Sequence, residues 1–152
     1  SWDTSSVTDM SRLLYQSYWL STSETPNMAS WDTSNVTDMS YMFSASNNIN
    51  PNVTNWDVGS VTTFRNMLPG GGASPFNRNI SGWDTSSAVD MRKMLAHCYN
   101  VNYDISSWDV SGVTTAANAY GFRWKSSSGP TYLVLLTCAK SPSFNSPINI
   151  GC

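Results

Sequence analysis

The chain has 152 residues and a formal net charge of −2, which is enough for one ordinary domain. Hydrophobic residues make up 40% of it and charged residues only 12%, about half the usual charged share. The aromatic share of 12% excludes a disordered tract, and the weak negative charge excludes a polybasic nucleic-acid or membrane-surface binder. With His97 as the single histidine, most nucleophilic and multi-histidine metal chemistry is also excluded.

A repeat organises the chain from its first residues. The string Trp31-Asp32-Thr33-Ser34-Asn35-Val36-Thr37-Asp38-Met39 has close copies that begin at Trp2, Trp56, Trp83 and Trp108. The spacings between successive Trp residues are 29, 25, 27 and 25. A period near 25 residues is typical of a solenoid, in which each repeat forms one coil.

Apolar residues recur at fixed distances from each Trp. They stand five, eight, eleven and twelve positions after it and three before it, as in Val36, Met39, Met42, Phe43 and Met28. A single coil cannot enclose these side chains, but stacked coils share one core. We therefore expect residues 1–120 to form a five-coil solenoid.

Each coil is predicted to contain one short helix and one short strand. Thr37 is a plausible helix cap, and Met39, Met42 and Phe43 follow at helical spacing. The segments that run into each Trp, such as residues 52–56, 79–83 and 104–108, favour strands. The predicted fold class is thus an α/β repeat.

Residues 121–152 depart from the repeat. An apolar run at 132–136 predicts a strand, and residues 144–148 resemble 76–80, so a partial sixth coil begins there. Because the chain starts and ends inside a repeat, we expect it to be a segment of a longer protein.

The string from Trp31 to Phe43 resembles the roughly 25-residue repeat of BspA-like leucine-rich-repeat surface proteins, which is also abundant in mycoplasma surface lipoproteins. The resemblance covers about residues 1–120 well and 144–150 weakly. It implies a leucine-rich-repeat-like solenoid and an extracellular or cell-surface location. It also implies a role in adhesion to a host or matrix protein.

Two columns of residues invite functional hypotheses. The Asp after each Trp could contribute to a calcium site. The pattern Asp-x-Ser/Gly instead favours an Asx-turn, in which the Asp side chain accepts the backbone N–H two residues later. The Trp column could bind carbohydrate, but its strict period favours the core.

Aromatic residues outside the Trp column are better candidates for partner contact. Trp19 and Trp124 are the two tryptophans that the repeat does not explain, and Phe122 and Tyr132 accompany Trp124. Aromatic side chains of this kind are enriched at protein interfaces. Tyr15 and Tyr18, near Trp19, belong to the same hypothesis.

Three cysteines are present, and in an extracellular protein one disulfide is expected. Cys98–Cys138 and the more local Cys138–Cys152 are both possible, and the sequence does not choose between them. A nucleophilic role for Cys98 beside His97 is disfavoured, because neighbouring residues of a helix point to different faces. Asn35, Asn52 and Asn79 stand in N-glycosylation triplets, and Asn52 is the best candidate.

We therefore expect a non-catalytic extracellular module for adhesion or protein/glycan binding, without a cofactor, nucleic-acid partner or membrane insertion. The alternative is a structural building block whose open ends stack on further copies or coils in a filament or complex. An ice-binding protein is a minor alternative, because the Thr columns are interrupted at Val58, Val89 and Val110. An enzyme is another, but no carboxylate pair has an interpretable spacing.

Overall fold

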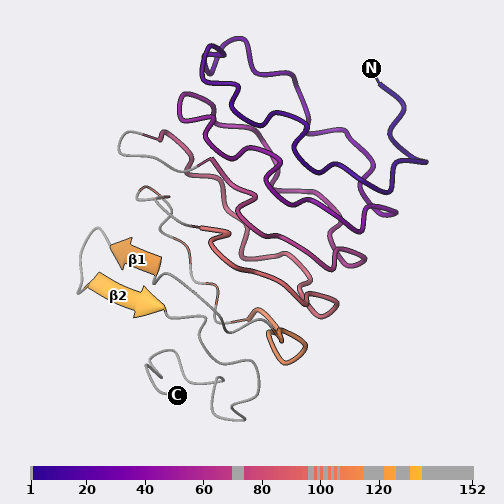
Figure 1. Ribbon diagram of the computed structural model, residues 1–152, viewed down its shortest axis with the longest axis vertical. Coiled ribbons are helices and arrows are strands. Elements are labelled where there is room, and N and C mark those ends of the chain that lie inside the picture. Colours follow the sequence, from indigo (N-terminus) through magenta and orange to yellow (C-terminus); the bar gives the residue numbers. More distant parts are fainter. Residues whose placement is uncertain are drawn as a thin grey trace.

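The structure, a computed structural model, describes residues 2–69, 74–95 and 107–114, the single positions 98, 100, 103 and 105, and two strands near the C-terminus. The backbone winds in coils that lie one upon another (Figure 1). Isolated parallel bridges join Asp9 to Asp38, Asp38 to Thr63, and Thr63 to Asp90. The seventh residue after each Trp therefore stacks in register with its counterparts.

The predicted helix is wrong for every coil that the structure describes, because the described residues contain none. In the four coils where it is described, the tenth residue after the repeat Trp has a positive φ: 56° at Arg12, 57° at Tyr41, 54° at Asn66 and 56° at Lys93. A left-handed residue interrupts a right-handed helix. The chain forms a tight turn instead, in which the Met42 N–H donates to the Met39 carbonyl at 3.3 Å.

The backbone hydrogen bonds that a helix would keep within itself go to the neighbouring coil. The Tyr41 N–H donates to the Arg65 carbonyl at 2.7 Å, and the Phe43 N–H donates to the Met67 carbonyl at 2.8 Å. The proposed cap Thr37 uses both its N–H and its hydroxyl to donate to the Thr8 carbonyl. Met39, Met42 and Phe43 all still reach the core, because the turn points the same three positions inward.

The predicted strand before each Trp is also wrong. The N–H groups of Trp56, Trp83 and Trp108 each donate to the carbonyl three residues earlier, at 3.1–3.2 Å, so these segments are turns. The fold is therefore not an α/β solenoid with a strand and a helix in each coil. In the described part of the chain, the coils consist of turns and extended links held together by stacking.

The two strands of the described chain are β1, Phe122–Lys125, and β2, Thr131–Val134. They pair antiparallel, with Phe122 opposite Val134 and Trp124 opposite Tyr132. Figure 1 shows them as the two arrows near the C-terminal end of the chain.

The core follows the predicted columns through the stack. Trp31, Trp56, Trp83 and Trp108 are buried, which confirms the core role of the Trp column. The Trp31 ring stacks on the Trp56 ring with centroids 6.1 Å apart and planes 8° from parallel. The side chains of Met39, Phe64 and Met91, one from each successive coil, are completely buried. This shared core and the bonds between coils set the positions of the surface residues.

Candidate interaction surface

One edge of the stack carries the Asp that follows each Trp. In every described copy, Oδ1 of this Asp accepts the N–H two residues later, at 2.9–3.1 Å. Hydrogen bonds from the following Ser hold the pKa of Asp3, Asp32, Asp84 and Asp109 below its ordinary value. The turn role predicted for this column is confirmed. Within the described residues, no cluster of three or more potential metal ligands is present.

A second surface, here called the lateral face, consists of Arg12, Tyr15, Tyr41, Arg65, Arg92 and Lys93. It follows the left-handed turns, so its side chains stand nine, ten or thirteen residues after the repeat Trp of their coil. The carbon at the centre of the Arg12 guanidinium and that of Arg65 each lie 5.4 Å from the Tyr41 ring centroid. Tyr41 thus orders two cations from the coils on either side of it.

Tyr15 extends this arrangement within the first coil. Its ring meets the Tyr41 ring edge to face, with centroids 6.3 Å apart and planes at 87°. The Arg12 guanidinium also lies 5.9 Å from the Tyr15 centroid. Arg12, Tyr15 and Arg65 are exposed, so the ordered group is open to solvent.

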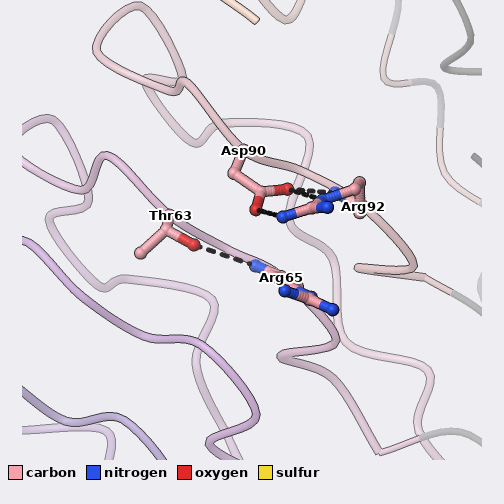
Figure 2. A network of polar contacts seen from close by, with 4 residues as sticks. All are labelled: Thr63, Arg65, Asp90 and Arg92. Carbon is pink, nitrogen blue, oxygen red and sulfur yellow. Dashed lines mark hydrogen bonds and ion pairs between the residues drawn. The ribbon is translucent and has the colours of Figure 1, made fainter. Parts of the chain in front are cut away.

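The pairing of the cations differs from coil to coil, as Figure 2 shows for the third and fourth. Asp90 accepts from the backbone N–H and Nε of Arg92 at 3.0 and 2.9 Å, and an ion pair holds the two side chains together. Thr63 occupies the same place in the preceding coil, and its hydroxyl accepts only the Arg65 backbone N–H, at 3.5 Å. Among the described residues, the Arg92–Asp90 pair is the one salt bridge, so Arg65 keeps its guanidinium available.

The predicted contact residues fall in two parts of the chain. Trp19 is 68% exposed and meets Tyr18 edge to face, with centroids 5.4 Å apart. Phe122 and Trp124 stand on β1 and Tyr132 on β2. The structure does not combine all four into one site within the described residues.

Sequence reasoning missed the lateral face. A signal was available, because four of the eight Lys and Arg residues stand nine or ten positions after a repeat Trp: Arg12, Arg65, Arg92 and Lys93. The predicted helix obscured this signal, since it assigned those positions to unrelated helical faces.

A disulfide at Cys98, one of the two possibilities that the sequence left open, is not supported by the structure. Cys98 is buried as a thiol, and its Sγ donates to the Pro69 carbonyl at 3.5 Å. Burial raises the pKa of this thiol to about 12. Cys138 and Cys152, the other members of the two predicted pairs, lie outside the described residues.

The three glycosylation triplets are on the surface, since Asn35, Asn52 and Asn79 are all exposed. The Asn35 amide nitrogen donates to the Ser5 carbonyl of the preceding coil at 2.8 Å. The Asn79 amide oxygen accepts the Ser81 N–H and hydroxyl, whereas Asn52 has one long contact to the Thr54 N–H at 3.5 Å. Occupancy of the sites stays a prediction, and of the three Asn side chains, Asn52 has the weakest hydrogen bonding to the described residues.

The described part of the chain contains no helix with the length and apolar character needed to cross a membrane. A family model described as "Mycoplasma protein of unknown function, DUF285" matches residues 1–74 and again residues 70–123. The chain belongs to the DUF285 family. The two DUF285 matches span the repeats, which agrees with the resemblance to mycoplasma surface repeat proteins. They do not identify a BspA-like protein or a leucine-rich repeat.

Comparison with curated proteins finds no match for this DUF285 chain, and comparison with solved structures finds none either.

Proposed function

We propose that this DUF285 chain is a non-catalytic extracellular or cell-surface module that binds a protein or glycan partner through its lateral face. The observation that carries the proposal is the ordered arrangement of Arg12, Tyr41 and Arg65 across three coils. Arg and Tyr are among the residue types that contribute most to binding energy at interfaces.

The scaffold beneath the lateral face supports this role. Tyr41 is followed directly by the fully buried Met42 and Phe43, and its own N–H is bonded to the next coil. Each cation–π contact at an exposed site contributes about 0.5–1 kcal/mol. These contacts restrict the conformations of the Arg side chains before a partner binds. Pre-ordered side chains lose less conformational entropy on binding.

The charges of this surface favour a partner with mixed polarity over a uniform polyanion. Asp9, Asp38 and Asp90 stand beside the cationic positions, and the first two accept the N–H groups of Ser11 and Ser40 at 2.7 Å. Guanidinium groups and carboxylates together supply both donors and acceptors, which suits the hydroxyl groups of a glycan or the polar surface of a protein.

The proposal is tested by applying the chain to an array of neutral, sialylated and sulfated glycans and to a panel of extracellular-matrix proteins. Tyr41→Ala combined with Arg65→Ala should weaken any specific binding by at least about tenfold, the value of 1.4 kcal/mol. Ser60→Ala, at an exposed position on the Asp edge, is the matched control. Binding that survives the double change, or no binding by the parent chain to either panel, would contradict the proposal.

A further inference from the structure

Two aromatic residues, Tyr18 and Trp19, stand together on one turn and are here called the aromatic corner. Their side chains are 64% and 68% exposed. The two rings meet edge to face, with centroids 5.4 Å apart and planes at 78°. One ring therefore stands beside the other like a wall beside a floor, and the angle between them is open to solvent.

The exposure of the aromatic corner is a property of its place in the coil. Tyr18 and Trp19 stand sixteen and seventeen positions after Trp2, and their counterparts in the second coil are Asn47 and Asn48. Hydrogen bonds join the second coil to a coil on each side, yet both of these Asn side chains are exposed. This turn thus directs its side chains out of the stack even where coils cover both sides.

Hydrogen bonds to the second coil hold the turn before and after the two rings. The Ser17 N–H donates to the Ser46 hydroxyl at 3.0 Å, and the Asn48 side-chain amide donates to the Tyr18 carbonyl at 2.9 Å. The Thr22 hydroxyl donates to the Asn48 carbonyl at 3.0 Å. A binding surface on an anchored turn loses less conformational entropy when a ligand arrives.

The polar atoms of the aromatic corner are not used by the fold. The buried Trp56 and Trp83 donate their indole N–H groups to backbone carbonyls. The Trp19 indole, the Tyr18 hydroxyl and the neighbouring Asn47 amide make no hydrogen bond within the described part of the chain. The corner therefore offers donors and acceptors next to its apolar ring faces.

The surroundings of the aromatic corner are uncharged. Residues 13–23 and 39–56 contain no Asp, Glu, Lys, Arg or His. Glu24, the next charge along the chain, accepts the Ser21 N–H and hydroxyl at 3.0 and 2.7 Å. A complementary ligand is therefore neutral and rich in hydroxyl groups or other uncharged donors and acceptors.

We propose that the aromatic corner binds a neutral glycan by stacking one pyranose ring on Trp19. The apolar C–H face of a pyranose matches an indole ring in size, and the hydroxyl groups at its edge pair with the Tyr18 hydroxyl and the Asn47 amide. A stable protein interface uses about 800 Å² and roughly 20–30 residues on each side. Two rings on one turn fit a sugar unit better than such an interface.

The test follows the indole N–H resonances of the chain by proton–nitrogen correlation NMR during titration with cellohexaose, chitohexaose and mannohexaose. Each sugar is added up to about 10 mM, because one stacked ring supports only weak binding. Trp19→Phe identifies the Trp19 resonance. This resonance should shift and saturate with at least one of the three sugars.

Saturation-transfer NMR, observed on the sugar, gives the affinities of the variants. Trp19→Ala should weaken binding by at least about tenfold, whereas Trp19→Tyr keeps an aromatic face and should retain most of the affinity. Asn47→Ala should weaken binding by about threefold or more, the loss of one edge hydrogen bond. Because Trp19 and Asn47 are exposed, unchanged urea midpoints should show that each variant is folded.

The aromatic corner and the lateral face share no residue, so the two proposals stand or fail separately. Tyr41→Ala combined with Arg65→Ala should leave binding at the corner unchanged, and lateral-face binding is measured in the Trp19→Ala background. Three results would overturn the present proposal: no Trp19 shift with any of the three sugars, equal binding by Trp19→Ala, or a Trp19 shift that depends only on the concentration of the chain itself. The last would show self-association in place of glycan binding.

Discussion

The indole N–H of Trp56 donates to the backbone carbonyl of Met28 at 2.8 Å, across the boundary between two coils. Trp83 repeats this bond to Val53 at 3.1 Å, and Trp108 repeats it to Ile80 at 3.2 Å. The acceptor always stands three residues before the previous Trp. Each of these three tryptophans therefore fills the core and also bonds its coil to the one before.

Replacing Trp56 by Phe keeps an aromatic ring but removes one of the two donors to the Met28 carbonyl, which still accepts the Trp31 N–H at 3.1 Å. We expect a loss of about 0.5–1.5 kcal/mol in the free energy of unfolding, the net value of one hydrogen bond, with a further loss from packing. Trp2→Phe is the control, because Trp2 is mostly exposed. Urea denaturation followed by circular dichroism measures both, and equal losses would show that the indole bond is unimportant.

Thr33 and Thr4 stand at the same place in successive coils but differ in hydrogen bonding. The Thr33 hydroxyl donates to the Asp57 carbonyl at 2.7 Å, whereas the buried Thr4 hydroxyl has no partner among the described residues. Thr33→Val should cost about 1–3 kcal/mol in the free energy of unfolding, and Thr4→Val should be neutral or stabilising. The prediction fails if urea denaturation shows the two substitutions to be equally damaging.

Ala45 has φ of 59° and an exposed side chain, so it bears left-handed strain without a functional group. Ala45→Gly should raise the free energy of unfolding by up to about 1 kcal/mol, because glycine adopts this conformation without steric cost. Ala45→Val should lower it. The control Ala29→Gly, at a position without positive φ, should be destabilising; thermal unfolding of the three variants provides the comparison.

The Asp edge predicts an acid-sensitive fold. Because Ser34 holds the pKa of Asp32 below its ordinary value of 3.8 in the folded chain, the unfolded chain binds this proton more tightly. The stabilisation is fully present above pH 3.8 and is lost as the pH falls through the lower, folded-state pKa. Asp3, Asp84 and Asp109 act in the same direction.

Ser34→Ala removes the main cause of the Asp32 shift, so it should flatten the loss of stability between pH 4 and pH 2. Ser60 makes no equivalent bond among the described residues, so Ser60→Ala should leave the pH dependence of the free energy of unfolding the same as in the parent chain. Urea midpoints measured across this range decide between them. An unchanged profile for Ser34→Ala would show that the Ser hydroxyl does not set the acid response.

Cys98 should resist thiol reagents in the folded chain, because burial both covers Sγ and raises the pKa to about 12. At pH 8 its modification should require unfolding and should accelerate with urea concentration. Mass spectrometry of the peptide containing Cys98 follows the reaction. Rapid labelling without urea would contradict the buried position.

The sequence by itself determined the period, the columns and the Asp turns. A Trp every 25 to 29 residues, with Val and Met at constant offsets, has no way to bury those side chains except by stacking coils, and Trp31 and Met39 are buried as that pattern requires. The Asp32 turn is equally local, since donor and acceptor are two residues apart.

Only the tertiary structure decided the conformation between those columns. Met39, Met42 and Phe43 have the spacing of a helix, but the same spacing also fits a turn with Tyr41 in the left-handed region. The choice depends on where each N–H finds its acceptor, and the carbonyls of Arg65 and Met67 belong to a coil about 25 residues away. That choice removed the predicted helix and created the lateral face, because bonds between coils satisfy the backbone groups that a helix would have paired within itself.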